Sequence, residues 1–117
     1  MSTDYEYREN GCGHCGRHDV RQVAHKGGGW STMFKVYDNP LIRSREDWVA
    51  YLREVPGRLY GDNGQGHIAD AVAWAQEQWA PPIRQQRKED DWLGTYAERG
   101  PIFRDPEGFR ISSGETS

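Results

Sequence analysis

Apolar residues recur at helical spacing in two stretches of the chain. In the first, Trp48, Leu52 and Val55 line one side, with Val49 beside them, which predicts a helix over Ser44–Val55. Ser44 can accept a hydrogen bond from a free N–H of the first turn, as N-cap serines do. Pro56 and Gly57 follow at once and end the pattern.

The second helical pattern covers Ile68–Ala80. Its apolar stripe repeats at four, three and four residues and consists of Ile68, Val72, Ala75 and Trp79, with Ala71 on the same side. Pro81 and Pro82 terminate it. Residues 83–91 are strongly charged and predict one or two exposed helical turns.

The remaining patterns are those of strands and turns. Residues 1–10 are polar, and we expect them to be extended or loosely held. A hairpin is predicted from Val20–Ala24 and Trp30–Tyr37, separated by consecutive glycines. A short strand is expected at 58–60. A second hairpin is expected over 102–111, where Gly108 suits the left-handed turn position.

These elements predict an α+β fold in which a zinc-binding turn and a small antiparallel sheet are packed by two helices. We expect residues 1–111 to form a single zinc-stabilised domain and residues 112–117 to form a disordered tail. A metal ion would be useful in a domain of 117 residues, whose hydrophobic core gives a modest stability margin.

Charge and composition narrow the functional classes. The formal net charge is −3, which argues against a surface devoted entirely to nucleic acid. The chain has 5 Trp and 6 Tyr, so we expect a core rich in aromatic rings. No apolar run is long enough to span a bilayer, and no signal-peptide core precedes the first helix, so a cytoplasmic location is expected.

Cys12 and Cys15 carry the strongest chemical signal. They are the only cysteines, they are two residues apart, and Gly16 follows, a pattern typical of a turn that places two thiolates on one zinc ion. A structural zinc needs four ligands. We expect His25 as the third and His18 as the fourth, with His67 or Asp19 as alternatives for the fourth and His14 pointing away. A redox dithiol is another interpretation, but no βαβ pattern surrounds the pair. Two reduced thiols in an ordinary loop are the simplest alternative.

Two surfaces are candidates for binding a macromolecule. Cations at Arg17, Arg21 and Lys26, with Trp30 and Phe34 nearby, could bind nucleic acid by charge and stacking, although an ordinary hairpin with an aromatic core side and a charged outer side is the preferred interpretation. The tryptophans suggest a protein interface. Two of the five complete the helical stripes, and the other three are left without a place in those stripes. Trp74 and Trp92 are the best candidates for exposed anchors of a partner. The acidic run at 89–91 is interpreted as a solvated face.

The segments Cys12–Asp19, His25–Trp30 and Glu46–Trp48 resemble those of a family of small, uncharacterised bacteriophage proteins with a zinc knuckle. Members of that family are similar in having a Cys-x-x-Cys-Gly-Arg-x-Asp turn, a Gly-Gly-Trp segment and a later helix that starts with an acid and a tryptophan. Ser31 stands where members often have a further cysteine, so the resemblance does not fix the third and fourth ligands. It implies a phage accessory protein and no particular chemistry.

No serine–histidine–acid or paired-carboxylate set is recognisable from spacing, and a four-ligand zinc has no open position for water. We therefore expect a non-enzymatic phage accessory protein that binds and inhibits a host protein. The alternative is a zinc module that binds nucleic acid through the face of Arg17, Arg21 and Lys26.

Overall fold

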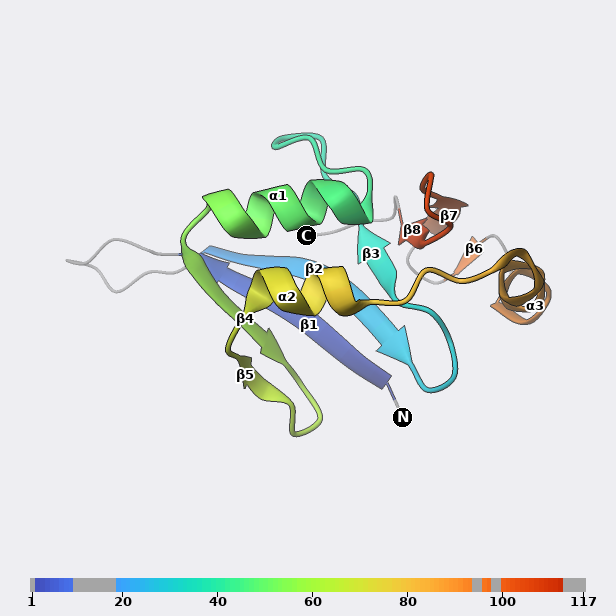
Figure 1. The fold of residues 1–117 in the computed structure, drawn as a ribbon, viewed down its shortest axis with the longest axis horizontal. Coiled ribbons are helices and arrows are strands. Elements are labelled where there is room, and N and C mark those ends of the chain that lie inside the picture. Colours follow the sequence, from blue (N-terminus) through green and yellow to red (C-terminus); the bar gives the residue numbers. More distant parts are fainter. Residues whose placement is uncertain (1, 10–18, 94–95, 98–99, 113–117) are drawn as a thin grey trace.

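The computed structural model describes residues 2–9, 19–93, 96–97 and 100–112 and shows an α+β fold (Figure 1). The helices of this part are α1 (Arg45–Glu54), α2 (Ala71–Glu77) and α3 (Ile83–Leu93). The strands are β1 (Ser2–Glu9), β2 (Asp19–Gly27), β3 (Met33–Lys35), β4 (Gly57–Gly61), β5 (Gly66–Ile68), β6 (Tyr96–Ala97), β7 (Gly100–Arg104) and β8 (Arg110–Ser112). The predicted fold class is confirmed.

The strands lie side by side in the order β5-β4-β1-β2-β3-β8-β7-β6. Neighbours are antiparallel except for β3 and β8, which run parallel with Met33 opposite Arg110 and Phe34 opposite Ile111. The sheet is therefore mixed, which corrects the predicted antiparallel sheet. In the described part of the chain, helices α1 to α3 and strands β4 to β7 come between β3 and β8, and the chain then returns to the free edge of β3 in the same direction.

The N-terminal residues form a central strand rather than a loosely held segment. β1 pairs with β2 on one side and with β4 on the other. Tyr5 and Tyr7 alternate with charged residues, so both rings point to the same face and are buried there. Of the two predicted alternatives, the extended conformation is confirmed for residues 2–9, and the loosely held segment is wrong because a polar composition concealed this two-residue alternation.

Helices α1 and α2 cover the face of the sheet that carries Tyr5 and Tyr7 (Figure 1). The predicted first helix is confirmed, including its N-cap, because the Ser44 hydroxyl accepts a hydrogen bond from Asp47 N–H. The second helix is shorter than predicted. Ile68 belongs to β5, and Asp70 caps α2 by accepting from Ala73 N–H.

The shorter α2 reverses the expected burial of two tryptophans. Trp74 lies in the core at 9% exposure, with its ring 4.6 Å from that of Tyr5. Trp79 follows the C-cap of α2 and is 44% exposed. The prediction of Trp74 as an exposed anchor was therefore wrong, since the helical stripe was extended past the true end of the helix.

Helix α3 packs against the opposite face. Residues opposite one another in register share a face, and Met33 and Arg110 alternate with the core residues Phe34 and Ile111. Arg110 and Arg104 both form ion pairs with Glu89 of α3. The charged segment 83–91 is thus part of a regular helix with one buried side.

The C-terminal hairpin of β7 and β8 is confirmed. Asp105 N–H donates to Phe109 C=O, and Gly108 adopts a φ of 99°. Ser112 is a buried residue of β8, which corrects the predicted start of the tail at 112. Residues 113–117 lie outside the described part. No helix among the described residues is long and apolar enough to cross a membrane.

Candidate interaction surface

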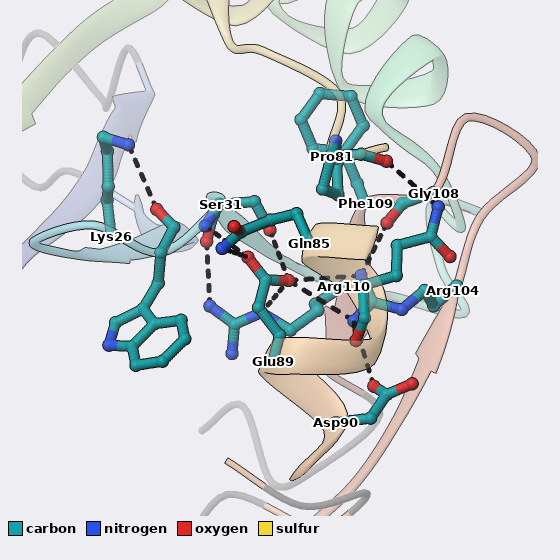
Figure 2. A network of polar contacts seen from close by, with 12 residues as sticks. Lys26, Ser31, Pro81, Gln85, Glu89, Asp90, Arg104, Gly108, Phe109 and Arg110 are labelled. Carbon is teal, nitrogen blue, oxygen red and sulfur yellow. Dashed lines mark hydrogen bonds and ion pairs between the residues drawn. The ribbon is translucent and has the colours of Figure 1, made fainter. Parts of the chain in front are cut away.

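A buried carboxylate connects the turn between β2 and β3 to α3. Glu89 has no exposed surface. Its oxygens accept hydrogen bonds from the backbone N–H of Ser31 at 2.7 Å and from the Ser31 hydroxyl at 2.8 Å. Gln85, one turn earlier on α3, donates to the same carboxylate at 3.0 Å (Figure 2). The end of the turn is therefore fixed on the helix.

Two arginines from the C-terminal hairpin complete this network. Nη1 of Arg104 and Nε of Arg110 lie 3.3 and 3.4 Å from Glu89 Oε1. Arg110 also donates through Nη2 to the carbonyl of Ser31 at 2.8 Å. Burial by itself would raise the pKa of Glu89, but the hydrogen bonds from Ser31 and Gln85 and the charge of Arg110 bring it below its ordinary value. Glu89 is thus a structural anion, and the prediction of a solvated face was wrong at this position.

The turn that Glu89 holds presents Trp30. Trp30 N–H donates to Gly27 C=O at 3.2 Å, and Gly29 has a φ of 79°, a conformation that favours glycine. Lys26 reaches across the turn and donates from Nζ to Trp30 C=O at 3.2 Å. Gln85 of α3 donates to Gly29 C=O at 3.4 Å. The turn is tied to itself and to α3.

A hollow of about 290 Å³ opens between this turn and α3. It is lined by Gly28, Gly29, Trp30, Lys88 and Trp92. Trp92 is the most exposed of the large apolar side chains among the described residues, at 75%. Lys88 and Trp92 are four residues apart on α3 and therefore lie on one side of the helix. The lining of the hollow thus combines two tryptophans, two glycines and a lysine.

Two lysines lie over tryptophan rings in and near the hollow. Lys88 Nζ is 5.6 Å from the centre of the Trp30 ring, and Lys26 Nζ is 5.5 Å from that of Trp79. Within the part of the chain that the structure describes, neither lysine forms an ion pair with a carboxylate. We call this surface the tryptophan face and define it by Trp30, Trp79, Trp92, Lys26 and Lys88.

The structure divides the predicted nucleic-acid surface. Arg17 lies outside the described residues. Arg21 is bound to Glu9 at 2.9 Å and lies 4.7 Å from the Tyr37 ring, so its charge is already paired. Phe34 is completely buried and cannot stack on a base, which corrects its proposed role. Lys26 remains available and belongs to the tryptophan face.

Of the predicted zinc ligands, Cys12, Cys15 and His18 lie outside the described residues. His25 lies on β2, and its Nδ1 is 2.7 Å from Asp4 Oδ1. Among the described residues no group of three or more histidine, cysteine or acidic side chains is placed to hold a metal ion. The ligand prediction therefore stays untested.

Chain length bears on His25 as a ligand. Glu9 and Asp19 are opposite each other where β1 ends and β2 begins, and His25 follows Asp19 by six residues. Six strand residues cover about 20 Å, whereas the three residues from Glu9 to Cys12 span at most about 10 Å. A zinc ion shared by His25 and Cys12 requires nearly the full reach of the chain and side chains, whereas His18 is next to Asp19.

The sequence predicted Trp92 as an exposed residue. It did not place Lys88 or Trp79 on this surface, and it did not predict that Glu89 is buried. The spacing of Gln85, Lys88 and Trp92 at three and four residues could have indicated one face of a helix. For Glu89 no local signal exists, because its partners Ser31, Arg104 and Arg110 come from distant segments.

In comparisons with known proteins, no protein-family model, no curated protein and no solved structure matches this chain. The functional argument therefore depends on the residues and their geometry.

Proposed function

We propose that this chain is a non-enzymatic binding protein whose tryptophan face docks a protein partner. The observation that carries the proposal is the 75% exposure of Trp92 beside a hollow lined by a second indole. Large aromatic side chains next to a hollow are favoured anchors of protein interfaces, because they bury much area at a low cost in conformational entropy.

The rigidity of the surroundings supports the same function. The Glu89 network joins the two backbone segments that carry the walls of the hollow, since Ser31 follows Trp30 and Glu89 lies between Lys88 and Trp92 on α3. A preorganised site loses less entropy when a partner binds. The surface is therefore suited to tight association.

Further parts of the proposal come from the sequence. Following the resemblance stated above, we assign the protein to the accessory proteins of a bacteriophage, acting in the cytoplasm of the host cell and inhibiting the host protein that it binds. A zinc ion held by Cys12 and Cys15, with His18 and a fourth ligand, would stabilise the connection between β1 and β2. Metal binding of this kind contributes directly to folding.

Binding of single-stranded nucleic acid is the second candidate. It is favoured by the lysines against Trp30 and Trp79, because stacked bases and phosphates require aromatic rings and cations together. The net charge of −3 and the pairing of Arg21 with Glu9 weigh against it.

The test is a comparison of wild-type protein and Trp92→Ala in affinity capture from nuclease-treated bacterial cytosol, followed by titration of the purified captured protein. We expect Trp92→Ala to weaken binding by about 30-fold or more, the size of an interface hot spot. Arg58→Gln, an exposed change on β4, is the control. Equal affinity of wild type and Trp92→Ala for that protein would refute the proposed site.

A further inference from the structure

We propose that the tryptophan face recognises an acidic segment of its partner, one that presents a large apolar side chain flanked by carboxylates. This inference rests on the proposed function and specifies the chemistry of the partner. It follows from the size of the hollow, from its lining, which includes Lys88, and from the position of Lys26 at the Trp30 carbonyl.

The hollow takes a single side chain. Its volume of about 290 Å³ is at the lower end of the range of about 300–1,000 Å³ that is typical of small-molecule pockets. Trp30 and Trp92 give it apolar walls, and Gly28 and Gly29 contribute no side chains that would fill it. An aromatic or large aliphatic side chain of a partner fits this shape and chemistry.

The charges at the rim select the flanking residues. Lys88 lines the hollow and lies over the Trp30 ring, and Lys26 donates to the backbone carbonyl of Trp30, so two ammonium groups lie close to Trp30. No carboxylate among the described residues forms an ion pair with either lysine. Each ammonium group has three N–H donors, and Lys26 uses one for Trp30 C=O, so donors remain for an incoming carboxylate.

The acidic residues at 89–91 differ in how much they offset the positive charge of Lys26 and Lys88. Glu89 is paired with Arg104 and Arg110, and Asp90 is paired with Arg104 at 3.0 Å. Asp91 is exposed, three residues after Lys88 on the same helix, and forms no ion pair within the described part. Removing its charge should therefore strengthen the binding of an acidic segment.

A nucleic acid is the less favoured occupant. Phosphate-driven binding needs several cations along a path, and Arg21, the nearest cation further along β2, is already paired with Glu9. A single apolar hollow lined by Lys88, with Lys26 bound to the carbonyl of Trp30, suits one anchor side chain with a few carboxylates. Oligothymidylate is therefore included in the test as the competing ligand.

The experiment measures fluorescence anisotropy of labelled peptides titrated with the full chain. The first probe has one phenylalanine between pairs of glutamates, the second replaces the glutamates by lysines, and the third replaces the phenylalanine by alanine. We expect only the first to bind, with affinity that falls as salt is added. We expect Lys88→Gln to weaken binding by up to about fivefold, Asp91→Asn to strengthen it, and Arg58→Gln to leave it unchanged.

Failure of the inference can be told from failure of the proposed function. Equal binding of the glutamate and lysine peptides, or no binding of any peptide, would overturn the acidic-segment inference. If the partner captured through Trp92 also binds Lys88→Gln with wild-type affinity, the proposed function stands and this inference fails. Tighter binding of oligothymidylate with a steep salt dependence would overturn both.

Discussion

Glu89 accepts hydrogen bonds from both the backbone N–H and the hydroxyl of Ser31, although the two residues are 58 positions apart in the chain. This relationship positions the hollow, because Ser31 directly follows Trp30 and Glu89 directly follows Lys88. Glu89, the most buried acidic residue in the described part of the chain, thus supports the surface that carries Trp92, the most exposed tryptophan.

Replacing Glu89 by alanine should destabilise the fold strongly. The change leaves Arg110 and Arg104 without their buried counter-charge and removes both acceptors of Ser31. Breaking one partner of a buried ion pair typically costs about 3–5 kcal/mol. Urea denaturation measures the loss, with Asp91→Asn as a surface control expected to change stability by less than about 0.5 kcal/mol. A change no larger than that of the control would show that the network is not structural.

Glu89 should also contribute to acid sensitivity. Its pKa is lower in the folded chain than its ordinary value of 4.5, so the unfolded chain binds the proton first. The contribution of ionised Glu89 to stability is therefore complete above about pH 4.5 and is lost as the pH falls below that value. The difference in unfolding free energy between wild type and Glu89→Gln should be constant from about pH 8 to about pH 5.5 and should narrow below about pH 4.5. A difference that narrows on the alkaline side instead would contradict this sign.

Substitution of Trp74 should destabilise the fold strongly, whereas substitution of Trp92 should hardly change its stability. Trp74→Ala removes a ring packed against Tyr5 and Phe34 and should cost about 3–5 kcal/mol. Trp92→Ala removes an exposed ring and should change stability by less than about 0.5 kcal/mol. Thermal unfolding by circular dichroism checks both variants. Comparable destabilisation by the two changes would show that Trp92 is a packed residue.

The proposed zinc ion gives a prediction about ligand rank. Cys12→Ser or Cys15→Ser should lower both the metal content of the purified protein and its melting temperature. Because His25 is bound to Asp4 and lies about 20 Å along β2 from Asp19, His18→Ala should cost more zinc affinity than His25→Ala. Competition with a colorimetric chelator ranks the two variants. A larger loss for His25→Ala would restore His25 as the third ligand, and a chain that binds no zinc would refute the site.

The sequence predicted those features that depend on neighbouring residues. The helix at Ser44–Val55, its N-cap and the C-terminal hairpin with Gly108 all follow from local spacing and turn chemistry, and the structure confirms them. The α+β class follows from the same patterns.

The features that were predicted wrongly depend on residues that are far away in the chain. β1 is central because β2 and β4 pair with its two edges, and residues 2–9 alone show only a weak alternation. Trp74 is buried and Trp79 is exposed because α2 starts only at Ala71, after Ile68 has joined β5, and ends at Glu77, before Trp79. Glu89 is buried only because Ser31, Arg104 and Arg110 converge on it. Pairings of this kind are decided by packing rather than by local propensity.

The central claim is that a protein partner docks on the tryptophan face, and photocrosslinking tests it most directly. A photoreactive amino acid replaces Asp91, the exposed neighbour of Trp92 on α3, in one variant and Arg58 in another, and each is irradiated in nuclease-treated bacterial cytosol. The account predicts one discrete protein adduct from position 91 that is absent from position 58 and is lost when Trp92→Ala is added. Adducts that form equally from both positions, or an adduct from position 91 that survives Trp92→Ala, would contradict it.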